Sequence, residues 1–196
     1  MSKQIPNSPE IEPLTRTQVL IAMGFTAIVL LAVAKLWQHL GSVPLLPLQG
    51  TTEAIFLGLA IAVFITGASS VVYQLWPAYR QSADFYLHLV IKPLVFPDLI
   101  WLGLLPGLSE ELLFRGVMLP AIGMNAAGLI ISSVVFGILH LSSPQQWSYV
   151  VWASVVGLLL GFSALATGNL LVPIVAHVAA NLISSCLWKL DKTKSA

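Results

Sequence analysis

The sequence contains little charge. Asp, Glu, Lys and Arg make up 9% of its 196 residues, whereas about 25% is usual for a soluble domain. From residue 116 to residue 188 none of these four residue types occurs. Hydrophobic residues make up 57% of the chain, and the mean hydropathy is +0.89. The composition therefore excludes an ordinary soluble domain and predicts an integral, multi-pass membrane protein.

The sequence also has only one cysteine and a net charge close to zero. Cys186 is the single cysteine, so the chain cannot form an internal disulfide. The formal net charge of +1 provides no basic surface for nucleic acid. We therefore expect contact with membrane lipid and no nucleic-acid partner.

Apolar runs separated by loops predict an all-α, polytopic helical bundle of about seven transmembrane segments, in a range of about six to eight. The expected segments are 17–37, 52–76, 85–105, 108–119, 125–141, 149–166 and 170–188. Lys92-Pro93 and Pro97-Asp98 interrupt the third segment, and Pro106-Gly107 predicts a chain break. Residues 108–119 rise only about 18 Å as a helix, so we expect a half-helix or a span with polar ends there.

Both ends of the chain are basic. Lys3 and Arg16 lie at one end, and Lys189, Lys192 and Lys194 at the other. The positive-inside tendency places both ends in the cytoplasm, which requires an even number of spans. Because a count of seven conflicts with this, we expect the error to lie between residues 85 and 119.

The chain shows no internal repeat. We divide it into a polar N-terminal tail (1–16), accessory transmembrane helices (17–104), a transmembrane core (105–188) and a basic C-terminal tail (189–196). Residues 19–31, followed by Ala32-Val33-Ala34, also resemble a signal-peptide core with a cleavage site. The prolines and acidic residues that precede them favour an uncleaved first transmembrane helix.

Two adjacent carboxylates, Glu110 and Glu111, precede the long uncharged region. Charge at the centre of a membrane helix costs roughly 2.5–3.5 kcal/mol per residue, so these groups must be paired, interfacial or functional. Residues four apart share a helix face, which predicts an ion pair between Glu111 and Arg115. Glu110 lies about 140° from Arg115 around the helix and stays free. The alternative is an ordinary helix start, with Ser109 as the N-cap.

Two histidines follow within the uncharged region. The same spacing places Phe136 beside His140 and His177 beside Asn181. A carboxylate shielded from water can act as general base, so Glu110 and His140 could activate water. His177 and Asn181 could stabilise the oxyanion of a tetrahedral intermediate. The alternatives are hydrogen-bonded packing histidines, an asparagine that bridges helices, or a transport site.

A zinc site is a further alternative. Glu110, His140 and His177 could bind zinc and leave one position for water. The sequence has no H-E-x-x-H motif, and the three residues lie far apart in the chain. The sequence alone leaves open whether water is activated by zinc or by Glu110 and His140.

Three motifs resemble the CAAX prenyl protease and bacteriocin-processing family of intramembrane endopeptidases. They are E-E-x-x-x-R at 110–115, F-x-x-x-H at 136–140 and H-x-x-x-N at 177–181. The resemblance covers residues 105–188 and implies an all-helical membrane enzyme. It implies that Glu110 is the base, that His140 binds or assists the water, and that the last motif forms the oxyanion pair. Glu111, Arg115 and Phe136 would then be supporting residues.

The resemblance implies hydrolysis of a peptide bond in a membrane-associated protein or peptide, with a prenylated CAAX protein as one substrate class. It leaves zinc open, and we favour a metal-free site. A non-catalytic membrane scaffold, acting as an immunity or assembly factor on the same fold, is the alternative. A transporter of the inverted-repeat type should show two similar halves, which the sequence lacks.

Overall fold

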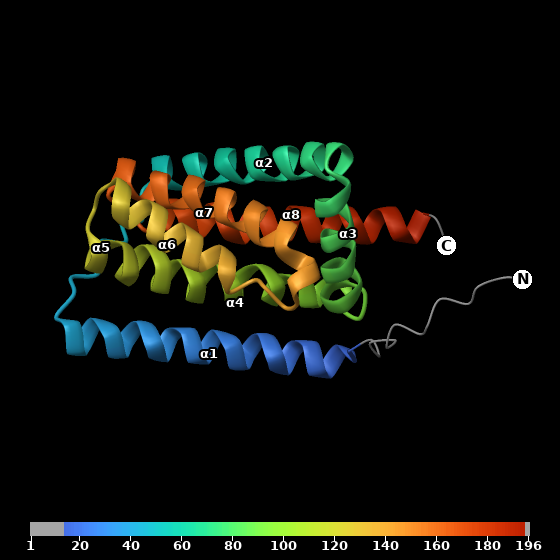
Figure 1. Cartoon of the computed structure of the whole chain (residues 1–196), viewed down its shortest axis with the longest axis horizontal. Coiled ribbons are helices and arrows are strands. Elements are labelled where there is room, and N and C mark those ends of the chain that lie inside the picture. The colour runs from blue at the N-terminus through green and yellow to red at the C-terminus, as the bar shows by residue number, and fades with distance from the viewer. Residues whose placement is uncertain (1–13, 195–196) are drawn as a thin grey trace, which may run out of the picture.

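The protein is a bundle of α-helices in a computed structural model, which describes residues 14–194 (Figure 1). Within that range there is no β-strand. The predicted all-α, polytopic architecture is confirmed. The expected tail residues 1–13 and 195–196 lie outside the described residues.

The elements follow the apolar runs of the sequence. The long helices are α1 (Arg16–Gly41), α2 (Thr52–Leu75), α7 (Trp147–Thr167) and α8 (Leu171–Lys194). The shorter helices are α3 (Pro77–Tyr86) and α6 (Ala126–Ile138). A side chain caps the start of α1, α2 and α6: those of Thr15, Thr51 and Asn125 accept hydrogen bonds from backbone N–H groups there. These bonds satisfy donors that a helix start leaves unpaired.

The region between residues 85 and 122 differs from the prediction. After α3 the helix continues as a π-helical turn, η1 (Leu87–Ile91). The chain then bends by 107° and runs as a second helical stretch from Phe96 to Ile122. That stretch joins a 3₁₀ turn η2 (Phe96–Asp98), α4 (Leu99–Glu111), a π-helical segment η3 (Leu112–Met118) and α5 (Leu119–Ile122).

The predicted break at Pro106-Gly107 is therefore wrong, as is a separate half-helix over 108–119. Pro106 lies inside α4. A proline removes one helical donor, and packing against neighbouring helices in a membrane protein compensates for the loss. Ser109 is not an N-cap, because it lies within α4 and its hydroxyl donates to the Leu105 carbonyl at 2.7 Å.

Four helices within residues 14–194 are long and apolar enough to span a membrane, or five if the bent pair counts as one span. About seven segments were expected; α6, with 13 residues, is shorter than these helices, and the stretch from Phe96 to Ile122 is one helical run. The N-terminal end of α1 and the C-terminal end of α8 lie at the same end of the bundle, and α3 crosses that end (Figure 1). The two ends lie together when the chain crosses the membrane an even number of times, which is what the basic residues at both ends of the sequence predicted.

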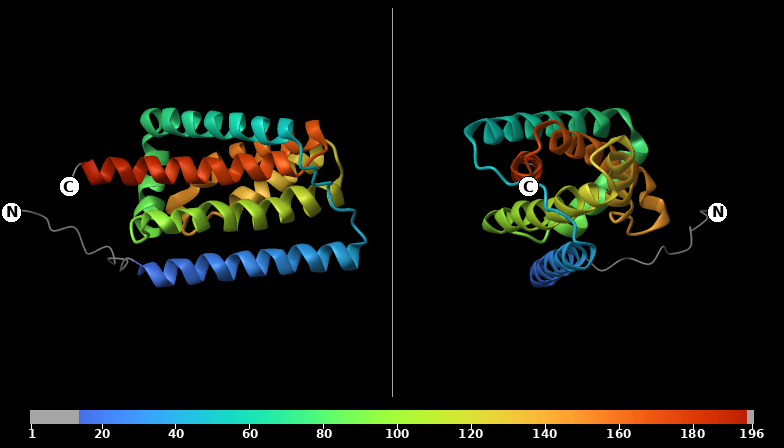
Figure 2. Two further views of the ribbon diagram at one scale, coloured as in Figure 1. Left: turned by 180° about the vertical axis from the view of Figure 1, so that it is seen from behind. Right: turned by 90° about the vertical axis from the view of Figure 1, so that its left-hand side faces the viewer.

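Helix α8 lies between α2 and α4 (Figure 2). Gly103 and Gly107 form the face of α4 that packs on α8. A Cβ atom at Gly107 would lie 2.4 Å from Val178 Cγ2 and 3.0 Å from the Val178 nitrogen. Small residues at this spacing let two membrane helices approach closely. The approach brings the following turn of α4, which carries the two glutamates, next to α8.

Helix α1 is the outermost element and packs on α4 and η3. Its buried residues Val19, Ala27 and Ala34 lie on one face, and most of its large apolar side chains are exposed, as expected for contact with lipid. Its first residue, Arg16, binds both carboxylate oxygens of Asp98 at 2.7 Å. This ion pair connects α1 to the start of the helical stretch that carries the glutamates.

We predict that Gly107→Ala separates α4 from α8 and lowers thermal stability in detergent, because the new methyl group meets backbone atoms that cannot rotate away. Gly24→Ala is the matched control, since a Cβ at Gly24 meets nothing within 4 Å. Thermal unfolding of both purified variants tests this. Equal stability of the two proteins would contradict the tight packing of α4 on α8.

We predict that the end of the bundle where α1 begins and α8 ends faces the cytoplasm, because it carries further basic residues. Arg80 lies on α3, which crosses that end, and Lys189, near the end of α8, bonds to the carbonyl of Lys92. Single cysteines at Thr193 and Gly50, in a Cys186→Ser background, should react differently with a membrane-impermeant maleimide in intact cells. Gly50→Cys should be labelled and Thr193→Cys protected. The opposite pattern would reverse the orientation.

Candidate active site

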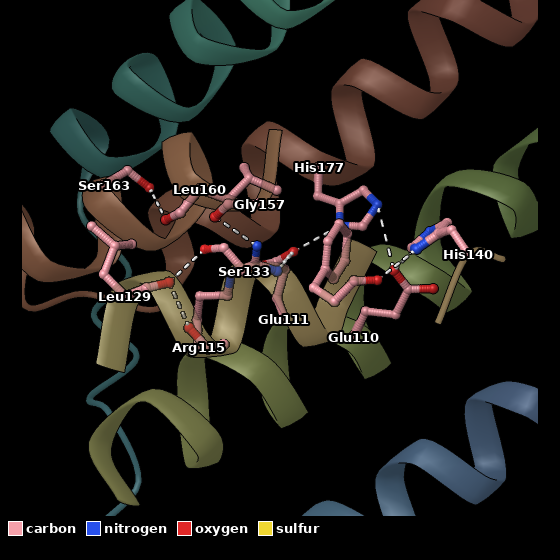
Figure 3. Close-up of polar contacts among 12 residues, drawn as sticks. Glu110, Glu111, Arg115, Leu129, Ser133, His140, Gly157, Leu160, Ser163 and His177 are labelled. Carbon is pink, nitrogen blue, oxygen red and sulfur yellow. Dashed lines mark hydrogen bonds and ion pairs between the residues drawn. The ribbon is translucent and has the colours of Figure 1, made fainter. Parts of the chain in front are cut away.

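Three helices bring one carboxylate and two imidazole rings together. Glu110 comes from α4, His140 from the turn that ends α6, and His177 from the first half of α8 (Figure 3). Glu110 Oε2 lies 3.9 Å from His140 Nε2 and 4.0 Å from His177 Nε2. The Glu110 side chain is 15% exposed, and its buried Oε2 has no hydrogen-bond partner within the described part of the chain.

The second nitrogen of each ring fixes its orientation. His140 Nδ1 lies 2.8 Å from the Phe136 carbonyl oxygen, and His177 Nδ1 lies 2.7 Å from Glu111 Oε1. Both partners are acceptors, so Nδ1 carries the hydrogen in both rings. Each ring therefore directs Nε2 toward Glu110. Separations of 3.9 and 4.0 Å exceed a direct hydrogen bond and suit groups that bind one small molecule between them.

The predicted pair of Glu111 and Arg115 is confirmed. Arg115 Nη1 lies 2.8 Å from Glu111 Oε1, and both side chains are fully buried. Arg115 Nη2 also donates to the Gly157 carbonyl of α7 at 2.9 Å. One glutamate is thus neutralised by arginine and hydrogen-bonded to His177, while the other makes no direct hydrogen bond to either residue. The two adjacent carboxylates have different environments for this reason.

Phe136 packs against both histidines and Arg115. Its ring centroid lies 4.8 Å from that of His140, which confirms the predicted proximity, and 6.0 Å from that of His177. Arg115 Cζ lies 4.5 Å from the Phe136 ring centroid, a distance at which a cation and an aromatic face attract each other. Phe136 therefore contacts both histidines and the buried arginine.

Asn181 lies one helical turn after His177 on α8. The structure records no hydrogen bond of its side chain among residues 14–194. Its role in binding an oxyanion therefore stays a prediction.

Two contacts of the site were not foreseen from sequence. The Gly157 carbonyl binds Arg115, and the hydroxyl of Tyr86 on α3 donates to the His140 carbonyl at 2.5 Å. A backbone carbonyl leaves no sequence signal, and Tyr86 lies 54 residues before its partner.

In this structure the three groups are spaced more widely than the ligands of one zinc ion. Four ligands at zinc distances of about 2.0–2.1 Å lie about 3.4 Å apart in a tetrahedron, whereas Glu110 lies 3.9 and 4.0 Å from the two rings. No group of three or more His, Cys, Asp or Glu residues in the described range is arranged to hold a metal ion. The steps proposed below use only the side chains of this site.

Comparison with protein families identifies the scaffold. Residues 92–183 match the model of the type II CAAX prenyl endopeptidase Rce1-like family. The chain is also 31% identical over 140 residues to the uncharacterized protein YpbD of Bacillus subtilis (strain 168), a match that covers 71% of each chain. The chain belongs to the Rce1-like family. All three motifs of the sequence lie inside the Rce1-like match.

Two further relatives of this Rce1-like chain are uncharacterized proteins. YyaK of Bacillus subtilis (strain 168) is 33% identical over 92 residues, which cover 43% of this chain and 30% of YyaK. A 24.3 kDa protein of Escherichia coli is 28% identical over 133 residues, which cover 61% of each chain. No solved structure matches the chain.

We predict that Arg115→Ala destabilises the protein by about 3–5 kcal/mol, because it leaves Glu111 charged and buried without its partner. Arg16→Ala is the matched control: it breaks an ion pair whose arginine side chain is 54% exposed, and its effect should be much smaller. Denaturation in mixed micelles measures both. An Arg115→Ala protein as stable as Arg16→Ala would contradict a stabilising role for the buried pair.

Proposed function

We propose that this Rce1-like chain is an intramembrane endopeptidase that hydrolyses a peptide bond in a membrane-associated protein or peptide. The supporting observation is the convergence of Glu110 Oε2, His140 Nε2 and His177 Nε2 from three helices. A structural polar cluster would place these atoms in direct hydrogen bonds. Here they are spaced so that a water molecule can lie between them.

In the proposed reaction Glu110 is the general base. Water donates one hydrogen to Glu110 and the other to His140 Nε2, which is an acceptor because Nδ1 carries the ring hydrogen. As the water oxygen attacks the scissile carbonyl, its proton moves to Glu110. Glu110 then returns this proton to the leaving amine when the C–N bond breaks. The Glu111–Arg115 pair leaves Glu110 as the free carboxylate for this cycle.

The proposed oxyanion site consists of His177 and Asn181. His177 donates from Nε2 when its ring carries two protons. The site then has no net charge, because two carboxylates, Glu110 and Glu111, are balanced by two cations, Arg115 and His177. A second proton on His177 therefore neutralises this buried cluster of four side chains. Asn181, one turn further along α8, supplies an amide donor toward the same side.

The proposed cleavage position is near the membrane interface. His140 lies past the end of α6, at the end of the bundle that α3 crosses (Figure 1), and its side chain is 28% exposed. A peptide tethered to the membrane can present a bond at this depth. The family description makes a prenylated CAAX peptide the first substrate to test.

We predict that Glu110→Gln lowers kcat by about 10²–10⁴-fold, the usual contribution of a general base, while the protein stays folded in membranes. Glu53→Gln is the control, because Glu53 is an exposed carboxylate in the first turn of α2. The assay compares prenylated and unprenylated membrane-tethered peptides, with chelator and with added zinc.

Cleavage that disappears in Glu110→Gln and persists in chelator supports the proposal. Activity retained by Glu110→Gln excludes Glu110 as the base. Inhibition by chelator that zinc reverses would replace the metal-free mechanism by a metal-dependent one. If the wild type cleaves no tethered peptide, the non-catalytic scaffold becomes the better explanation.

A further inference from the structure

We propose that Tyr86, on the short helix α3, is a positioning residue for His140. The proposal rests on the function proposed above, because it assigns α3 a role in the same site. Residues 92–183 match the family model, so α3 lies outside the matched segment.

The Tyr86 hydroxyl lies against the turn that carries His140. It donates to the His140 carbonyl at 2.5 Å and accepts from the Ser142 backbone N–H at 3.2 Å. Ser142 Oγ lies 2.9 Å from the same hydroxyl. One phenol therefore fixes the backbone on both sides of Leu141.

His140 depends on such a contact because it lies beyond the regular part of α6. The helix ends at Ile138, and the backbone N–H groups of His140 and Leu141 bond to the Gly137 and Ile138 carbonyls in tighter turns. Terminal turns are the least constrained part of a helix. The Phe136 carbonyl holds one ring nitrogen, and the Tyr86 contact holds the backbone that carries the ring.

Tyr86 is itself held by neighbouring aromatic rings. Its ring centroid lies 4.4 Å from that of Tyr149 on α7, and the Tyr149 centroid lies 6.1 Å from that of His140. The Tyr149 ring also stacks on Tyr79 of α3 at 6.1 Å. These contacts form a continuous aromatic cluster from α3 to the catalytic histidine.

Hydrogen bonds of two buried serines connect α3 to α7. Ser82 Oγ and Ser148 Oγ lie 2.8 Å apart, and Ser148 Oγ donates to the Ala78 carbonyl at 2.9 Å. Because α3 is fixed to the first turn of α7, it can hold the end of α6 in one place. Displacement of a reacting group by about 1 Å can cost about 10²-fold in rate, so such a constraint has a catalytic consequence.

Tyr86→Phe keeps the ring and removes the hydroxyl. We predict that kcat falls about 10- to 100-fold while KM is unchanged, because the lost hydroxyl bonds to the backbone that carries His140 and a positioning role acts on the chemical step. Tyr73→Phe is the matched control: its hydroxyl donates to Asp84 Oδ1 at 2.7 Å, so it also loses one hydroxyl hydrogen bond. Thermal unfolding of both variants measures any general loss of stability.

Histidine NMR separates this proposal from the proposed function. The protein is labelled with ¹⁵N-histidine in a Glu110→Gln background, which needs no activity, and His140→Gln assigns the signal. We expect Tyr86→Phe to broaden or split the His140 Nδ1–H signal and Tyr73→Phe to leave it unchanged. An unchanged His140 signal in Tyr86→Phe, or an equal change in Tyr73→Phe, overturns the positioning role. If the wild type has no protease activity, the proposed function fails and the NMR comparison still decides the role of Tyr86.

Discussion

The site depends on one fully buried ion pair, between Glu111 and Arg115. Removing two charges from water is costly, and hydrogen bonds from neighbouring groups offset part of that cost. Here the arginine also binds the Gly157 carbonyl and lies over the Phe136 ring. The glutamate also accepts from His177. The pair thereby connects α4, α6, α7 and α8.

The same pair explains how two adjacent glutamates acquire different properties. Glu111 is bound by a cation and an imidazole, whereas Glu110 faces two Nε2 atoms at 3.9 and 4.0 Å. Successive residues on a helix point about 100° apart, so a single α4 turn can present one carboxylate to the arginine and the other to the histidines. The close packing of Gly103 and Gly107 on α8 then brings His177 within reach of both.

Sequence reasoning succeeded where a contact is local. The composition predicted the membrane bundle, and four-residue spacing predicted the pairs of Glu111 with Arg115 and Phe136 with His140, because helix geometry fixes neighbours at that spacing. It failed at Pro106, where the stability of the helix depends on α8 rather than on the proline itself. It also missed Tyr86 and Gly157, because their partners lie 54 and 42 residues away and only tertiary packing brings them together.

The position of Glu111 and Arg115 on one helix has a consequence for biogenesis. Membrane helices enter the bilayer before they pack against one another. Because the arginine lies four residues after its partner, the pair can form within the nascent helix, before α6, α7 and α8 have been synthesised. Glu110 is then the one unpaired ionisable group between Leu99 and Ile122 at the moment of insertion. An ion pair shared between two helices would have required each of them to insert an isolated charge.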